Sequence, residues 1–208
     1  MTDFLTFEES EATRQLINLG YVHAAQSFSA VARQPIAIET THLSISRAVG
    51  FLDEHAFQPD RLRVLTTRLI GELPGKSLLV FSESDCQEVY RLCLANHFSS
   101  EKSGELEEAI LLEIDNILAA AVIAQFANAL GVKMYGGVPQ LHQTDRAGLV
   151  ASLMDGNSGS AANYYLFSNA RFTLKDNSLL QPQFIWILPE DFLKAIQRKI
   201  RAGEKLVR

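Results

Sequence analysis

The chain has 208 residues, of which 47% are hydrophobic and 21% are charged, and this is the composition of an ordinary folded protein. Its formal net charge of -5 excludes the dense positive surface that a nucleic-acid binder needs. No basic segment and apolar run open the sequence, as they would in a secretory or transit peptide, and Glu8, Glu9 and Glu11 follow at once. We therefore expect a cytoplasmic protein with no nucleic-acid partner.

Two further features bear on compartment. The most apolar stretch, residues 117–127, is too short to span a bilayer and contains Gln125, so we expect a buried helix and no membrane partner. Cys86 and Cys93 share one face of a predicted helix, which favours two reduced core residues over a disulfide.

In the first half of the chain, a helical pattern ends before Pro35, which cannot continue it. Residues 36–46 then alternate like a half-buried strand. The turn Leu73-Pro74-Gly75-Lys76 predicts a hairpin between residues 64–72 and 77–81. The other elements expected here are a helix at 10–33, a short helix at 48–55, a strand at 61–65 and an amphipathic helix after the hairpin.

In the second half, a long helix at 106–130 ends at Gly131. The polar, glycine-rich residues 155–160 predict a loop. The other elements expected here are a strand at 132–141, a helix at 144–154, paired strands at 164–174 and 184–188 joined through residues 176–178, and a helix at 192–200.

The two halves echo each other. Residues 15–20, QLINLG, resemble residues 113–118, EIDNIL, and residues 78–85 resemble residues 185–191. We therefore expect one α+β domain over residues 1–208, built from repeat halves at about 9–99 and 104–201 that are related by a pseudo-twofold operation. Its sheet should be antiparallel or mixed and covered by the two long helices.

Most catalytic motifs are absent. Residues 71–77 imitate a phosphate-binding loop, but only three residues separate Gly71 from Gly75. Residues 156–160 fail the nucleophile-elbow pattern because Ser160 occupies the last glycine position. The five histidines lack metal-ligand spacing, so we expect no metal or cofactor of the protein's own.

The 106–130 helix carries the candidate site. Its predicted core face holds Ile110, Ile114, Ile117, Leu118 and Ala121. Glu113 and Asn116 project together from another side, and we expect Ala109, Leu112, Ala119, Ala120 and Ile123 to surround them as a docking surface. The alternative is structural: Asn116 bonds a neighbouring loop and Glu113 is a solvated helix edge.

The spacing of Glu113, Asn116 and Pro139 resembles the CheC-like family, which includes CheC, CheX and flagellar-switch relatives. That family has Asp or Ser, then Glu four residues later, Asn three further on, and Pro after twenty-two more, which here are residues 117–138. Ala109 departs from the first position. The first-half copy has Gln15, Asn18 and Thr41 at the positions of Glu, Asn and Pro. Because the Glu and the Pro are replaced, we interpret it as a degenerate second site.

The resemblance implies a phosphatase for the aspartyl-phosphate of a CheY-like receiver domain, in chemotaxis or related two-component signalling. Asn116 would orient the attacking water, Glu113 would pair with the receiver's lysine, and Mg²⁺ would belong to the receiver. A homodimer is a further assembly that this reading leaves open. The alternative function is a non-catalytic binding module for a phosphorylated receiver or a flagellar-switch partner. A small-molecule enzyme is poorly supported, because no motif brings a nucleophile close to a base.

Overall fold

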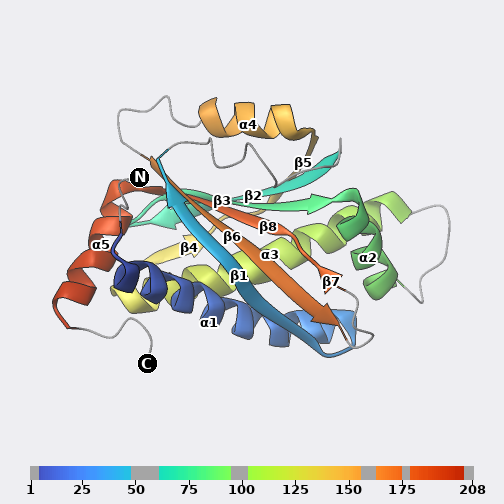
Figure 1. Cartoon of the computed structure of the whole chain (residues 1–208). Helices are drawn as coiled ribbons and strands as arrows, with labels where there is room; N and C mark the ends of the chain where they lie inside the picture. Colours follow the sequence, from blue (N-terminus) through green and yellow to red (C-terminus); the bar gives the residue numbers. More distant parts are fainter. Residues whose placement is uncertain (1–4, 48–60, 95–102, 156–162, 175–178, 204–208) are drawn as a thin grey trace.

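The computed structural model describes residues 5–47, 61–94, 103–155, 163–174 and 179–203. In these ranges the chain is α+β, with helices packed on a curled antiparallel sheet (Figure 1). The predicted helix at 48–55, most of the predicted loop at 155–160 and the connection at 176–178 lie outside the described residues.

In its described residues, the first half supplies two helices and three strands. Helix α1 begins with a capping box, in which the Thr6 hydroxyl accepts from the Glu9 N–H and the Glu9 carboxylate accepts from the Thr6 N–H at 2.8 Å. This cap places the helix start earlier than the predicted residue 10. The elements are α1 (Phe7–Ala32), β1 (Ile36–Ser46), β2 (Leu62–Gly71), β3 (Gly75–Ser82) and α2 (Glu83–Leu94).

The second half repeats this order with additions. The strand predicted at 132–141 is wrong in detail, because the backbone leaves the sheet between Gly136 and Gln140 and so forms two short strands. The two-residue strand β7 was not predicted. The elements are α3 (Ser103–Leu130), β4 (Met134–Gly136), β5 (Gln140–Thr144), α4 (Arg146–Asp155), β6 (Asn163–Leu174), β7 (Leu179–Leu180), β8 (Gln183–Pro189) and α5 (Glu190–Arg201).

The sheet interlocks the two halves. Its strand order is β1-β6-β8-β3-β2-β4, with β5 also paired to β2 and β7 to β6, and every described pair is antiparallel. The first strand of each half therefore pairs with the hairpin of the other half. The offset in residue number that separates Gln15 from Glu113 also separates Ile36 from Met134 and Ser46 from Thr144. These residues are the ends of β1 and of the β4–β5 pair. Superposition of the halves by a twofold rotation stays a prediction.

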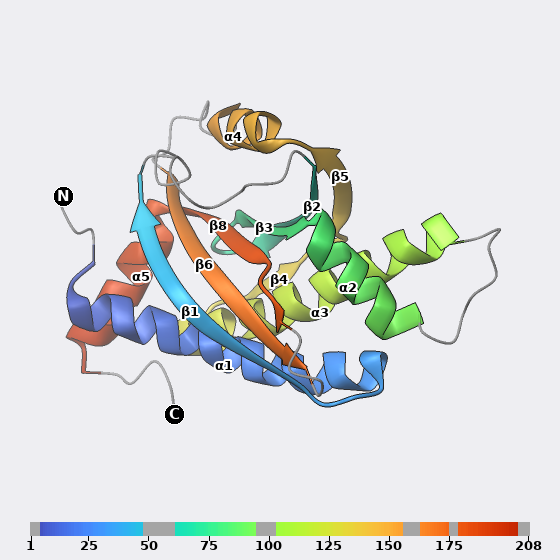
Figure 2. The same cartoon turned by 45° about the vertical axis from the view of Figure 1, so that its right-hand side comes forward.

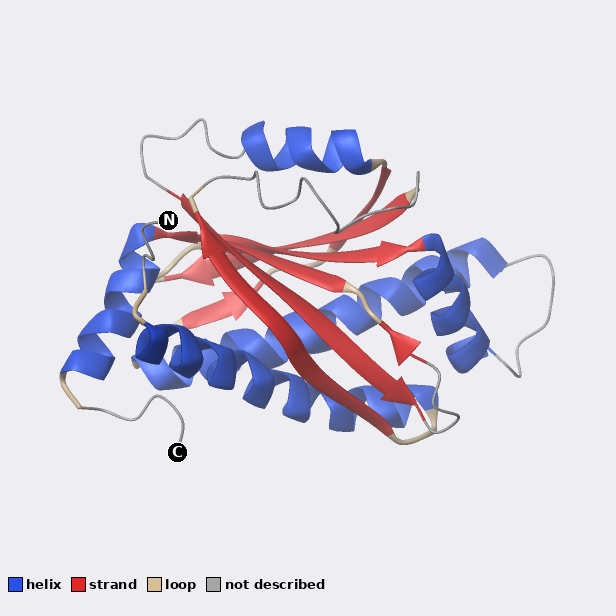
Figure 3. Cartoon of the chain, in the orientation of Figure 1, coloured by secondary structure: helices blue, strands red, loops and turns tan. Residues whose placement is uncertain are grey.

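The sheet has a core on each face. Helices α1, α3 and α5 lie on one side and α4 lies on the other (Figures 1 and 3). The larger core lies under α1, α3 and α5 and contains Phe126, Phe184, Trp186 and Phe192. A smaller core lies under α4, where Leu149 and Leu153 meet the opposite faces of the strands.

Helices α1 and α3 cross at very close range. A Cβ atom added to Gly20 would lie 2.7 Å from the Cα of Val122, so only glycine allows this approach. Nearby, the amide nitrogen of Gln125 and Nδ1 of His23 form a 3.0 Å hydrogen bond between the two helices. The orientation of α3 is therefore set by α1 as well as by the sheet.

By length and apolar composition, residues 104–130 of α3 qualify as a membrane span. In the fold this helix instead packs against α1 and the sheet, and Leu111, Ile114, Leu118, Val122 and Phe126 are buried in the larger core. It is a core helix of this fold, as the sequence predicted. Both cysteines are free, Cys86 being buried and Cys93 half-buried, which confirms that they form no disulfide.

Candidate functional site

The outward side of α3 presents Glu113 and Asn116 together. Both side chains are exposed, and so are Ala109 and Ala120, which lie above and below them at helical spacing. Neither polar side chain forms a hydrogen bond or ion pair within the described part of the chain. The expectation that Glu113 and Asn116 face solvent is therefore confirmed. The alternative in which Asn116 bonds a loop finds no such contact among the described residues.

The surroundings of this pair differ from the prediction. Ala119 and Ile123, expected on the docking surface, are buried, and Leu112 is only partly exposed. A Cβ added to Gly136 of β4 would lie 3.4 Å from the Cδ1 of Ile123, which shows how closely that side chain approaches the sheet. Between Ala109 and Ala124 the exposed residues of α3 form a narrow stripe of Ala109, Glu113, Asn116, Ala120 and Ala124, which we call the α3 stripe.

Behind the α3 stripe lies a buried carboxyl group that the sequence reading missed. Asp115 is fully buried, and the hydroxyl of Thr67 on β2 donates to its Oδ2 at 2.6 Å. Its Oδ1 has no hydrogen-bond partner among the described protein atoms. Burial raises the pKa of Asp115 from 3.8 to about 7, because the interior disfavours the charged form, and the Thr67 hydrogen bond opposes the shift only in part.

The sequence did hold a signal for this burial. Asp115 is four residues after Leu111 and three before Leu118, and both leucines are fully buried. Those spacings place the carboxyl group on the core side of the helix. A carboxylate-bearing residue there needs a partner, and the hydroxyl of Thr67 supplies one.

The first-half copy of the motif is arranged differently. Gln15 is exposed, and its amide donates to the Glu11 carboxylate at 3.1 Å. Asn18 is half-buried, and its Oδ1 accepts the backbone N–H of Thr40 in β1 at 3.1 Å. The amide that corresponds to Asn116 is thus engaged in holding α1 to β1.

Pro139 and Thr41 occupy corresponding places in the two halves. The register of β1 shifts between Thr40 and His42, so Thr41 lies in a bulge, but the strand continues. In the second half, Pro139 lies between β4 and β5 where the strand is interrupted, as expected for a residue without a backbone N–H. Pro139 is half-buried at this break and forms no part of the α3 stripe.

The described residues contain no candidate metal site. No group of three or more histidine, cysteine, aspartate or glutamate side chains is close enough there to hold an ion. The α3 stripe offers one carboxylate and one amide. The carboxylate can bind a cationic group of a partner, and the amide can orient a water molecule.

No protein-family model matches the sequence, and no curated protein sequence matches it. Solved structures do match. FliY from Thermotoga maritima has a TM-score of 0.72 and 13% identity, over 97% of this chain and 100% of that one. FliM from a FliG–FliM complex of H. pylori has a TM-score of 0.60 and 12% identity, over 91% and 100%. The chemotaxis protein CheX from Desulfovibrio desulfuricans has a TM-score of 0.53 and 10% identity, over 84% and 99%. The chain has the fold of these proteins.

Proposed function

We propose, from the CheC/CheX/FliM-type fold of this chain, that it is a phosphatase acting on the aspartyl-phosphate of a CheY-like receiver domain in the cytoplasm. The observation that carries the proposal is the pairing of Glu113 and Asn116 on the α3 stripe. Both are exposed and unengaged among the described residues, and they keep the family spacing to Pro139.

The reaction needs little covalent chemistry from the protein. The oxygen of a water molecule forms a bond to phosphorus while the bond from phosphorus to the receiver's aspartyl oxygen breaks, which yields phosphate and the free carboxylate. Positioning and charge stabilisation supply most of the catalysis in phosphoryl transfer. Magnesium in the receiver neutralises the phosphoryl oxygens.

Asn116 suits the orientation of that water. Its amide offers a donor and an acceptor that can hold a water molecule in one direction. Because no described side chain occupies it, the amide is available when a receiver docks. Glu113, one helical turn away, meets the receiver's active-site lysine and fixes the register of docking.

The small side chains around Glu113 and Asn116 support a protein partner over a small molecule. Ala109, Ala120 and Ala124 leave the Glu113 and Asn116 side chains standing above the helix surface, where a concave receiver site can enclose them. Ala109 also removes the acidic or hydroxyl contact that the resemblance would place there. Docking therefore depends on Glu113 more heavily than the family pattern implies.

The test is release of phosphate from a phosphorylated CheY-like receiver of the same organism, with Mg²⁺, in the presence of this protein. We expect the lifetime of the aspartyl-phosphate to shorten in proportion to protein concentration, and Asn116→Ala to remove most of the effect. A receiver that binds the protein with an unchanged phosphate lifetime would refute the phosphatase.

A second candidate is a non-catalytic binding module. It is favoured by the match to FliM in a complex with FliG, since that FliM is part of an assembly. In this case the receiver or switch partner binds the α3 stripe, and Asn116→Ala leaves phosphate lifetime unaltered. The same phosphate-release assay, run beside a binding measurement, separates the two functions.

A further inference from the structure

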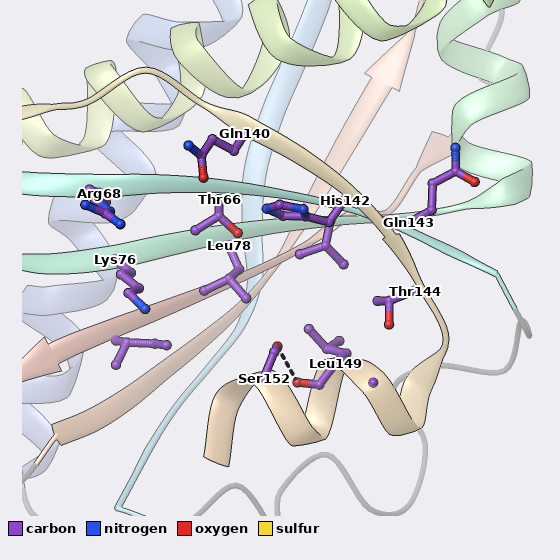
Figure 4. Close-up of a pocket in the computed structure, with 13 residues that line it drawn as sticks. Thr66, Arg68, Lys76, Leu78, Gln140, His142, Gln143, Thr144, Leu149 and Ser152 are labelled. Atoms are coloured by element: carbon purple, nitrogen blue, oxygen red, sulfur yellow. Dashed lines mark hydrogen bonds between the residues drawn. The ribbon is translucent and has the colours of Figure 1, made fainter. Parts of the chain in front are cut away.

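A pocket of about 390 Å³ lies on the opposite side of the sheet from the α3 stripe, between strands β2, β3 and β5 and helix α4 (Figure 4). Its volume is in the range of small-molecule sites. Figure 2 shows β5 leading directly into α4, so the strand and helix form one wall of the space. The α3 stripe contributes nothing to it.

The base of the pocket is apolar. Val64, Leu78, Leu149 and Ile187 line it, and all four are buried members of the core under α4. These side chains come from three strands and one helix. A ligand that fills this part therefore needs an apolar body.

One end of the pocket carries two cations that have no partner among the described residues. Arg68 on β2 and Lys76 on β3 are directly opposite in the strand register, and Figure 4 shows them together at one end. Like charges opposite each other destabilise a sheet. Neither side chain forms a hydrogen bond or ion pair within the described part of the chain, and none of the described residues that line the pocket is acidic.

Two cations facing each other at one pocket differ from the paired cations found at several other places on the surface. The chain has 24 acidic and 19 basic residues, so carboxylates are plentiful. Some described cations elsewhere pair with them, namely Arg14 with Glu11, Arg91 with Glu88, Arg171 with Glu39, and Lys194 with Glu190, whereas others such as Lys133 do not. No carboxylate of the described residues pairs with Arg68 or Lys76, which leaves two positive charges for an anion from outside.

Neutral hydrogen-bonding groups continue from the cations across the pocket. Thr66, Gln140 and His142 follow along β2 and β5. Ser152 lies across from them on α4, where its hydroxyl donates to the Leu149 carbonyl at 2.8 Å (Figure 4). Thr66 pairs with Gln140 in the register, and Val64 pairs with His142, so the three polar side chains lie on neighbouring positions. Hydroxyl and amide donors beside two cations match the several acceptor oxygens of a phosphate.

We propose that this pocket binds a small phosphomonoester, with the phosphate between Arg68 and Lys76 and an apolar body over Leu78, Leu149 and Ile187. A phosphate carries up to two negative charges and so can neutralise both cations, whereas a carboxylate can neutralise only one. The site is separate from the α3 stripe, and the proposal does not rest on phosphatase activity.

Binding of phenyl phosphate, measured by calorimetry with the full chain, tests the proposal. Three control ligands separate the parts of this molecule. Inorganic phosphate has the anion alone, phenol has the ring alone, and benzoate has the ring with a carboxylate. We expect phenyl phosphate to bind most tightly, and Arg68→Gln with Lys76→Gln to weaken it at least about tenfold. Equal affinity for benzoate, or no binding of phenyl phosphate, would overturn it.

Two variants guard against a trivial result. Lys133→Gln removes an exposed cation elsewhere and should leave phenyl phosphate affinity unchanged, so an equal loss there would show mere surface charge. Ser152→Trp keeps both cations and fills the pocket from the exposed side of α4. It should abolish binding, and undiminished binding to this variant would place the anion outside the pocket.

Discussion

Thr67 on β2 donates a 2.6 Å hydrogen bond to the carboxyl group of Asp115 on α3, at a fully buried position directly behind Glu113 and Asn116. This contact ties the rotation of α3 about its own axis to the sheet. The exposed pair and the buried carboxyl group lie on one helical turn. The direction in which the α3 stripe faces therefore depends on a polar contact within the core.

The free energy of unfolding should fall as pH rises from 3.8 through about 7, because the folded state holds the Asp115 proton more tightly than the unfolded state does. The contribution of this group is complete below the lower value and lost above the higher one, and it is on the order of 4 kcal/mol. Asp115→Asn keeps an acceptor for Thr67 and cannot titrate.

Urea unfolding at pH 5 and pH 8 measures this difference. We expect the stability of Asp115→Asn relative to the wild-type protein to be higher at pH 8 than at pH 5, because wild-type stability falls further over this interval. Among the described residues no charged side chain contributes to the shift, and burial is its main cause. Parallel pH profiles for the two proteins would contradict the raised pKa of Asp115.

Thr67→Val should destabilise the protein at every pH between 5 and 8. The substitution keeps the β-branched shape but removes the only described hydrogen-bond donor to Asp115, which leaves both carboxyl oxygens unpaired at a cost of about 1–3 kcal/mol. Thr66→Val is the matched control, since Thr66 lies on the same strand, is half-buried and faces the other side of the sheet. Chemical denaturation of both variants should separate them, and equal losses would argue against the Asp115 contact.

The crossing of α1 and α3 predicts opposite effects for two glycine substitutions. Gly20→Ala places a Cβ 2.7 Å from the backbone of Val122, so the helices must move apart, at a cost of about 1–3 kcal/mol. Gly104→Ala in the first turn of α3 meets nothing within 4 Å and gains helix propensity, by up to about 1 kcal/mol. Thermal unfolding of the two variants should shift in opposite directions. A harmless Gly20→Ala would show that the crossing is looser than described.

The sequence predicted the elements well where local signals are strong. Pro35 marked the end of α1, and the Pro74-Gly75 turn marked the β2–β3 hairpin. It did worse where tertiary packing decides. The α3 helix packs against α1 and the sheet together, so more than one face is buried, and Ala119 and Ile123 could not be separated from the surface by a single apolar stripe.

Asp115 shows the same difficulty from the polar side. A carboxylic acid in a helix is ordinarily solvated, and the buried hydroxyl that satisfies it comes from β2, far away in the sequence. No pattern within the α3 sequence predicts that Thr67 is the partner of Asp115. The exposure of Glu113 and Asn116, by contrast, followed from helical spacing alone.

The two asparagines of the repeat should separate stability from activity. The Oδ1 of Asn18 accepts the Thr40 N–H, so Asn18→Ala leaves a half-buried backbone donor without its partner and should cost about 1–2 kcal/mol of stability. The phosphate-release rate should change little. Asn116→Ala removes an exposed amide with no contact among the described residues, so its stability should match the wild type, while the rate should fall on the order of 100-fold, as for loss of a positioned hydrogen-bonding group.

Glu113→Gln completes the set, because it gives the second copy the Gln and Asn pair of the first. Affinity for the phosphorylated receiver should weaken, since the charge that meets the receiver's lysine is lost while side-chain volume is kept. Receiver affinity, phosphate release and denaturation, measured for all three variants, distinguish the roles. A crippled rate in Asn18→Ala beside a mild one in Asn116→Ala would move the working site to α1, and unaltered rates in all three would leave the chain a binding module.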